Sequence, residues 1–340
     1  MSATTLIGHT AAERFFTGSL ERGNLNHAYL VLGPSGVGKT TLVRRFLGHL
    51  LCALGTGCGT CPACRQVQEG IHPDVWWVSR TADKQDIAIE QVRELQQFTA
   101  LGSLSGGWRA VVIEGAHYLN AESGNALLKV LEEPPTKMIF FLLSDEPRRV
   151  LPTIRSRCFV LQLGLVPSGE ITELLRRQGA TVGEASELAQ LAGGRPGVAL
   201  ELLAQPERRA REREGVQLFL GLMSGRGFAT FTRYLEQEIK ESSSGEQARL
   251  SDGQAARQWA LSLLVVWRTA ARDLICTKLD LSDYVCYGSL QAELKVAAQV
   301  PVLALVHRNY LIEEAHRRLV ANAHVRLTLE WLAYSLLQTA

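Results

Sequence analysis

Residues 33–40 read Gly-Pro-Ser-Gly-Val-Gly-Lys-Thr and match the phosphate-binding pattern G-x-x-x-x-G-K-[S/T] in full. The segment follows a short apolar run, Ala28–Leu32, and opens a helical pattern, which is the context that this motif requires. Glycines let backbone N–H groups surround a phosphate, and a helix N-terminus adds partial positive charge. Lys39 is expected to reach the β- and γ-phosphates and Thr40 to bind Mg²⁺. The motif therefore predicts a nucleotide or phosphate site.

A second candidate position lies where the apolar run Ala110–Ile113 ends in Glu114 and Gly115. An ATPase with this loop usually carries Asp-Glu here, the Asp serving Mg²⁺ and the Glu polarising the attacking water. Glu114 is one methylene longer than Asp and can still serve the metal, but Gly115 has no side chain. Losing a general base typically costs about 10²–10⁴ in rate. We therefore expect little or no hydrolysis, unless a nearby carboxylate such as Glu122 takes over.

Four of the seven cysteines are clustered as Cys52-x5-Cys58-x2-Cys61-x2-Cys64, in a segment rich in glycine. Four thiolates with no open coordination position suit a tetrahedral, structural Zn²⁺ site. Two overlapping C-x-x-C steps are also compatible with a redox centre, although the thioredoxin-like βαβ pattern of such centres is missing around them. The spacing favours structural zinc.

Two arginines, Arg155 and Arg157, lie in the segment Leu151–Cys158 between the fourth and fifth predicted strands. Loop arginines are often simply solvated. Phosphoryl transfer, however, often uses an arginine from a neighbouring subunit, which contributes about 10³–10⁵ in rate. An arginine directed away from its own phosphate-binding loop would serve the nucleotide of another chain.

The elements that position these residues follow from the apolar pattern. Short apolar runs predict buried strands at Ala28–Leu32, Val75–Val78, Ala110–Ile113, Met138–Leu143 and Phe159–Leu163. Helical patterns lie between them at Thr40–Leu51, Ile87–Ala100 and Ala121–Glu132. Buried strands that alternate with helices indicate an α/β domain, with a five-stranded parallel sheet covered on both faces. After Leu163 the pattern is helical, with three short helices within Pro167–Ala204.

Length and composition limit the remaining possibilities. A chain of 340 residues is expected to form two or three domains. Its net charge of +2 excludes a global basic field of the kind that coats nucleic acid. The sequence has neither a signal-peptide pattern nor an apolar run of membrane-spanning length. We therefore expect a cytoplasmic protein without membrane contact.

Taken together, these motifs resemble the delta-prime subunit family of the bacterial DNA polymerase III clamp loader, whose members are AAA+ proteins. The most specific pieces are Asn125–Pro135 (NALLKVLEEPP) and Ser156-Arg157-Cys158. Other matching stretches are Ile7–His9, His27–Leu30, Gly33–Thr41, the cysteine module, His72–Asp74 and, more weakly, Ala321–Leu332. The resemblance covers essentially the whole chain.

The resemblance implies a P-loop AAA+ core at 1–163 with an inserted zinc module at 52–64, a helical lid at 164–204 and an all-α collar at 205–340. It implies ATP or ADP with Mg²⁺, the adenine lying near Leu6 and Ile7. The nucleotide-binding residues are then Leu6, Ile7, Gly33, Pro34, Ser35, Gly36, Val37, Gly38, Lys39, Thr40, Thr41 and Glu114. The structural zinc ligands are Cys52, Cys58, Cys61 and Cys64, and Arg157 is the arginine finger that acts in trans.

In function, the resemblance implies a stator that binds ATP, hydrolyses little of it, and helps load the sliding clamp onto primed DNA during replication. Its partners would be the gamma/tau motor subunits and the delta subunit in a hetero-pentamer, with the clamp and the primer-template backbone contacted through the complex. The alternative is an active gamma/tau-type motor or another AAA+ remodelling ATPase. Gly115 and Gly197, the latter where a motor carries its sensing arginine, favour the stator. The complete phosphate-binding loop favours the motor.

Overall fold

The computed structural model describes residues 6–81, 84, 86–104, 106–225, 227–242 and 248–338. The chain divides into two compact units, which are described separately. Unit 1 comprises Met1–Gln178 and Gly194–Ala199, and unit 2 comprises Gly179–Gly193 and Leu200–Ala340. The further division into core, lid and collar stays a prediction.

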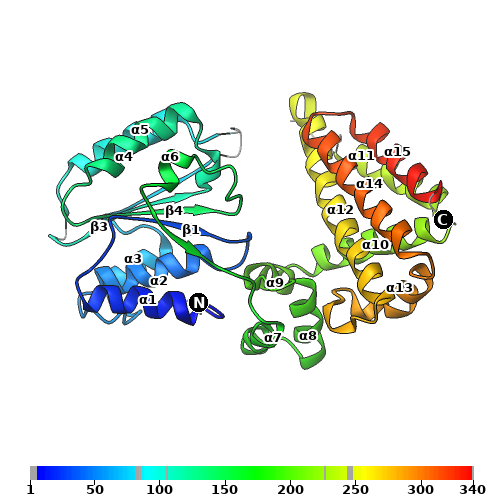
Figure 1. Cartoon of the computed structure of the whole chain (residues 1–340), viewed down its shortest axis with the longest axis horizontal. Helices are drawn as coiled ribbons and strands as arrows, with labels where there is room; N and C mark the ends of the chain where they lie inside the picture. The colour runs from blue at the N-terminus through cyan, green and yellow to red at the C-terminus, as the bar shows by residue number, and fades with distance from the viewer. Residues whose placement is uncertain are drawn as a thin grey trace. The chain divides into compact units, whose positions relative to one another are not determined.

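Unit 1 is built on one five-stranded parallel sheet (Figure 1). Its strands are β1 (Ala28–Leu32), β2 (Val75–Ser79), β3 (Arg109–Glu114), β4 (Met138–Ser144) and β5 (Phe159–Gln162). The order across the sheet is β2-β3-β4-β1-β5, and every neighbouring pair is parallel. The carboxyl ends of all five strands therefore meet at one edge of the sheet, which is where the phosphate-binding loop begins.

Helices cover both faces of this sheet (Figure 1). One face carries α1 (Thr10–Glu21), α2 (Lys39–Leu51) and α3 (Pro62–Glu69), and the other carries α4 (Ile89–Ala100), α5 (Ala121–Glu132) and α6 (Pro152–Arg155). Because side chains alternate along a strand, Tyr29 and Val31 of β1 pack into the core on one face, and Leu30 packs into the core on the other. The predicted α/β core with a five-stranded parallel sheet is confirmed.

The prediction that the fifth strand is buried is wrong. Phe159 is 41% exposed and Val160 is 38% exposed. The reason is topological, because β5 lies at the end of the strand order and, among the strands that the structure describes, pairs with β1 alone. The ring of Phe159 is covered on one side, where it stacks on Phe15 with ring centroids 4.9 Å apart.

The chain after β5 is helical, as predicted. Unit 1 also contains α7 (Ser168–Arg177) and the first turn of α9 (Pro196–Ala204). Unit 2 contains α8 (Val182–Leu191), α10 (Pro206–Met223), α11 (Phe228–Ser242), α12 (Ala248–Lys278), α13 (Gln291–Ala297), α14 (Val302–Val320) and α15 (Val325–Gln338). The core of unit 2 surrounds the fully buried Trp267, whose indole N–H donates to the Gly215 carbonyl at 3.0 Å.

Within the described part of the chain, no single helix combines the length and the apolar composition of a membrane span; one pair, Gly288–Ala297 with Val302–Val320, meets both only together and is bent by 114°.

Candidate nucleotide-binding site and metal centre

The phosphate-binding loop connects the end of β1 to the start of α2, and two of its glycines have left-handed backbone conformations. Gly36 has φ +78° and Gly38 has φ +110°, values that residues with a side chain rarely adopt. Gly33 is required for a different reason, since a Cβ there would lie 2.7 Å from the carbonyl oxygen of Leu163. The Gly33 N–H donates to the Ser144 carbonyl of β4 at 3.1 Å. The loop is therefore anchored to the sheet edge at its first residue.

Lys39 begins α2 and turns its ammonium back into this loop. Its Nζ donates to the carbonyl oxygens of Gly33, at 2.7 Å, and Pro34, at 2.9 Å. Burial lowers the pKa of Lys39, and the carboxylates of Asp145 and Glu114 oppose that shift. A partly desolvated ammonium at the N-terminus of a helix is a strong binding group for a phosphate.

Thr40 and Glu114, which are 74 positions apart in the sequence, are brought together. The Thr40 hydroxyl donates to Glu114 Oε1 at 2.9 Å. This contact joins the first turn of α2 to the carboxyl end of β3. A hydroxyl beside a carboxylate at this place offers the oxygen ligands that Mg²⁺ prefers.

Gly115, the next residue, has no room for a side chain. Its φ is +78°, and a Cβ there would lie 2.6 Å from Cδ2 of Tyr118. Its N–H donates to the Leu143 carbonyl of the neighbouring strand at 3.0 Å. The backbone at the end of β3 is therefore shaped for glycine, and it does not present a general base from this position.

Three polar residues that were not predicted, His117, Ser144 and Asp145, complete this edge of the sheet. His117 is buried, and its Nδ1 lies 3.1 Å from the Ser144 hydroxyl and 3.3 Å from Asp145 Oδ1. Burial lowers the pKa of His117, and the carboxylates of Asp145 and Glu146 oppose that shift. His117 lies three residues after the end of β3, Ser144 is the last residue of β4, and Asp145 follows it. Their position at the end of a buried strand is therefore the sequence signal that could have found them.

The predicted adenine-binding residues lie close to the loop. A Cβ on Gly38 would be 3.6 Å from Cδ1 of Leu6, and Ile7, the next residue, is half-buried. Nε2 of His9 lies 2.9 Å from the Val37 carbonyl oxygen. These residues thus reach the loop from a segment that precedes the sheet in sequence.

The first turn of α9 also contacts the loop. The N–H of Gly197 donates to the Gly36 carbonyl at 2.8 Å. A Cβ on Gly197 would lie 3.0 Å from that same oxygen. Position 197, where the resemblance places the sensing arginine of a motor, is therefore packed against the loop backbone.

Other predicted loop residues differ in their exposure. Ser35 is exposed, whereas Val37 is buried. Thr41 lines a cavity on the outer face of α2, together with Arg44 and His49.

Arg157 lies far from this site along the sheet. It precedes β5 by two residues, and Phe159 of β5 pairs with Tyr29 near the start of β1 in parallel register. Arg157 is therefore at the amino edge of the sheet, whereas the phosphate-binding loop is at the carboxyl edge. Its side chain is 36% exposed, with Nη2 2.5 Å from Glu132 Oε1 and Nη1 donating to the Thr153 carbonyl at 3.0 Å.

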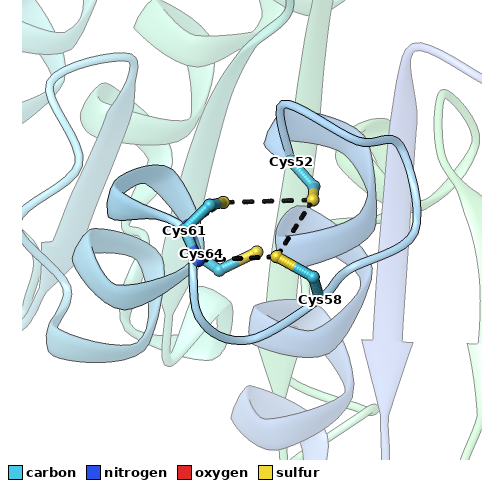
Figure 2. Close-up of side chains that lie close together, drawn as sticks. All are labelled: Cys52, Cys58, Cys61 and Cys64. Atoms are coloured by element: carbon cyan, nitrogen blue, oxygen red, sulfur yellow. Dashed lines mark hydrogen bonds between the residues drawn. The ribbon is translucent and has the colours of Figure 1, made fainter.

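The four clustered cysteines converge between the end of α2 and the start of α3 (Figure 2). All four Sγ atoms lie within 4.8 Å of one another. The Cys52 Sγ is 3.7 Å from that of Cys58 and 3.9 Å from that of Cys61. Zn–S bonds of about 2.3 Å in a tetrahedron place the sulfurs about 3.8 Å apart. The donor set and its spacing therefore fit zinc, Cys52 included.

Backbone N–H groups surround these sulfurs. The amides of Leu54, Cys61 and Cys64 each lie 3.4 Å from a cysteine sulfur, those of Cys52, Cys58 and Cys61 respectively. Backbone hydrogen bonds, that of Cys58 first, lower the pKa of Cys52 to about 5, whereas burial raises the pKa of Cys64 to about 12. N–H donors stabilise the thiolate form that a metal requires.

Comparisons with known proteins match this chain to subunits of DNA polymerase III. Residues 8–166 match the family model described as DNA polymerase III, delta subunit. The chain is 37% identical over 201 residues to DNA polymerase III subunit delta' of Pseudomonas aeruginosa, covering 57% of this chain and 61% of that protein. It is 33% identical over 196 residues to subunit gamma/tau of Mycobacterium tuberculosis, covering 55% of this chain and 34% of that protein.

A gamma subunit-related protein from Thermotoga maritima is similar in structure at a TM-score of 0.46 and 15% identity, covering 97% of this chain and 98% of that one. The chain spans about three fifths of the length of the delta' relative. The sequence matches confirm the predicted resemblance to delta-prime subunits of DNA polymerase III.

Proposed function

From its match to the delta' subunits of DNA polymerase III, we propose that this chain is a clamp-loader stator. It binds ATP or ADP with Mg²⁺, hydrolyses little of it, and helps load the sliding clamp onto primed DNA. The observation that carries this proposal is Gly115. A complete phosphate-binding loop stands beside a strand end whose left-handed backbone and neighbouring Tyr118 ring exclude a side chain.

Nucleotide binding is supported by the groups that converge at the carboxyl edge of the sheet. Lys39 supplies the phosphate contact, and the Thr40–Glu114 pair supplies oxygen ligands for Mg²⁺. Leu6 and Ile7 would receive the adenine on the other side of the loop. Nucleotide binding and nucleotide hydrolysis need different groups. A site that keeps its phosphate and Mg²⁺ ligands but lacks a general base therefore binds nucleotide and hydrolyses little of it.

Arg157 is proposed to act on a neighbouring chain. It lies at the sheet edge opposite its own phosphate-binding loop and carries a half-exposed guanidinium. An arginine placed there contacts a nucleotide only if another subunit brings that nucleotide to it. We assign the neighbour as a gamma/tau-type motor subunit, in a hetero-pentamer that also contains delta. Residues 205–340, which belong to unit 2, are the proposed collar of that assembly.

The four cysteines are proposed to hold structural Zn²⁺. Their sulfurs leave no open position for a substrate, so the metal would fix the loop between α2 and α3 rather than take part in a reaction. Contact with the primer-template is proposed to be shared among subunits and directed to the DNA backbone, since the chain has a net charge of only +2.

The second candidate is an active gamma/tau-type motor. The observation that favours it is the intact set Lys39, Thr40 and Glu114, together with 33% identity to a gamma/tau subunit. Under this alternative a carboxylate outside position 115 activates the water.

ATP turnover of the purified chain separates the two candidates. The stator proposal expects tight Mg-nucleotide binding that Lys39→Ala abolishes, with less than one turnover per chain over an hour. Repeated turnovers that Lys39→Ala also abolishes would establish the motor instead. Adding gamma/tau and delta then tests assembly, because a stator must enter a stable complex whose ATPase depends on its presence.

A further inference from the structure

The outer face of the phosphate-binding helix α2 borders the four-cysteine centre. Positions 41, 44, 45, 48 and 49 recur at helical spacing and line one side of a cavity of 340 Å³. The opposite wall consists of α3 and of residues 52–61, the segment between α2 and α3 that is called the metal-binding loop below. The full lining consists of Thr41, Arg44, Arg45, Gly48, His49, Thr56, Gly57, Cys58, Gly59, Cys64 and Gln68. Two cysteines of the centre and two arginines therefore share one cavity, and none of the described residues that line it carries a carboxylate.

Arg44 is a half-buried cation without a carboxylate partner among the residues that the structure describes. Its Nη1 donates to the Gln68 carbonyl at 3.3 Å, and its guanidinium lies 5.1 Å from the ring centroid of Trp77. Its Nε is buried and has no hydrogen-bond partner within the described part of the chain. Arg45, its neighbour on the same cavity, differs because it forms an ion pair with Glu13. A desolvated positive charge is costly unless a negative charge lies nearby.

The metal-loaded centre would provide that negative charge. Four thiolates around one Zn²⁺ carry formally two units of net negative charge. Cys52 caps the carboxyl end of α2, where the helix dipole is itself negative. The Sγ of Cys64 lies 3.5 Å from the carbonyl oxygen of Gly48, one helical turn after Arg44. On the α2 side the centre thus meets groups that raise the cost of its negative charge, although the backbone N–H groups of Leu54, Cys61 and Cys64 lower that cost at the sulfurs.

The two sides of the cavity are also packed together. Gly57 has φ +62°, and a Cβ there would lie 2.7 Å from Cδ2 of His49. The imidazole ring of His49 therefore sets how closely the metal-binding loop approaches α2. Arg44 fixes the other end of the same interface through the Gln68 carbonyl of α3.

We propose that Arg44 is a positioning residue of the four-cysteine centre, offsetting its negative charge and fastening α3 to α2. The inference rests on the proposed structural zinc. A Zn²⁺ ion held by four thiolates keeps a net negative charge, so a cation on the same cavity favours the loaded state. A phosphate in this cavity would face the negative centre, which is why the cavity is assigned to charge compensation rather than to an anionic ligand.

The test is the rate at which the full-length zinc-loaded chain releases zinc to a chromogenic chelator. Changes around metal ligands typically cost about 10- to 100-fold in metal affinity, so we expect Arg44→Gln to release zinc about 10-fold faster. Arg44→Lys should recover part of the loss, because it keeps the charge but not the planar contact with Gln68 and Trp77. The matched control is Arg45→Gln, which removes the same charge from the same cavity where Glu13 already balances it.

The salt dependence of zinc release and the absorption of the Co²⁺-loaded chain separate a lost charge interaction from misfolding of the variant. Raising the salt concentration should narrow the difference between Arg44→Gln and the native chain, since screening weakens the interaction. The Co²⁺-loaded variants should keep the absorption of tetrahedral thiolate coordination.

Equal release rates for Arg44→Gln and the native chain, or equal acceleration by Arg45→Gln, would overturn the proposal. So would faster release from the native chain in inorganic phosphate than in chloride at the same ionic strength, because that assigns the cavity to an anion. A native chain that holds no zinc would instead refute the proposed metal.

Discussion

The Thr40 hydroxyl donates a 2.9 Å hydrogen bond to Glu114. This bond joins the first turn of α2 to the carboxyl end of β3. The two residues form one oxygen-lined position beside Lys39, whose ammonium is held by the loop carbonyls. In the proposed nucleotide site this relationship separates two roles, because Lys39 would contact the phosphates directly and Glu114 would act only through a bound Mg²⁺.

Glu114→Gln should therefore weaken nucleotide binding only when Mg²⁺ is present. Removing the carboxylate charge lowers the affinity for a hard cation, and we expect about a 10-fold loss for Mg-ATP, equal to about 1.4 kcal/mol. Affinity measured with a fluorescent nucleotide in EDTA should not change. Glu122→Gln, on the exposed first turn of α5, is the control. An equal loss in EDTA would contradict a metal role for Glu114.

Restoring a glutamate at position 115 should not create an ATPase. Gly115→Glu introduces a side chain at φ +78°, against the ring of Tyr118. We expect it to destabilise the fold by about 1–3 kcal/mol, the usual cost of a residue held in a rare backbone conformation. Urea denaturation gives the stability change, and ATP turnover gives the activity. A stable variant with vigorous turnover would show that only the missing carboxylate prevents hydrolysis.

His117 should make the fold sensitive to mild acid. Burial lowers its pKa in the folded chain below the usual value of about 6.5. As the pH falls through about 6.5, the unfolded chain takes up a proton that the folded chain does not, so stability decreases. The loss continues until the pH reaches the lowered folded value. The free energy of unfolding in urea, measured between pH 7.5 and 5.5, should fall less for His117→Gln than for the native chain. Identical slopes would remove His117 as the cause.

The cysteine cluster should bind one Zn²⁺ per chain through all four thiolates. Cys52→Ser should reduce zinc retention as strongly as Cys58→Ser, because their sulfurs lie 3.7 Å apart in one cluster. Chelation should lower the midpoint of thermal unfolding. Cys158→Ser is the control, since that cysteine is outside the cluster. Zinc analysis by mass spectrometry is the measurement, and full retention by Cys52→Ser would leave a three-thiolate site.

Arg157→Ala should leave nucleotide binding by the isolated chain unchanged, since Arg157 is at the sheet edge opposite the loop. In the reconstituted complex, loss of an arginine finger typically costs about 10³–10⁵ at the nucleotide site that it serves. The total ATPase rate of the complex falls only by the contribution of that one site. Single-turnover kinetics is therefore the sharper measurement, because it can resolve the slow site from the others. Arg155→Ala controls for charge, and equal effects of the two variants would argue against a specific role for Arg157.

Local patterns in the sequence predicted most of the fold. The bounds predicted for β1 and α5 are those observed, because a buried run between turn residues and a capped amphipathic stretch are both local signals. The exposure of β5 could not be predicted in this way. Four of the five residues of Phe159–Leu163 are apolar, and only the order of strands in the sheet places this segment at an edge.

The same distinction holds for the site. The phosphate-binding loop and the cysteine spacing are continuous motifs, so their residues could be predicted directly. His117, Ser144 and Asp145 come together because parallel strands end at one edge, and no sequence spacing encodes their 3.1 and 3.3 Å contacts. The role of Arg44 could not be predicted for a related reason. Its contact with the Gln68 carbonyl and the unsatisfied Nε among the described residues become evident only when α2 and α3 are packed together.

The parallel sheet also gives unit 1 a polarity. Its own nucleotide loop is at one edge, and the arginine proposed for a neighbour's nucleotide is at the other. Chains that engage through these two edges must associate head to tail, which generates directional rows or rings rather than two-fold pairs. In an open row, one terminal chain offers an arginine that no loop receives, and the chain at the other end keeps a loop that no arginine completes. A subunit that needs only one of the two edges is therefore suited to the end of such a row.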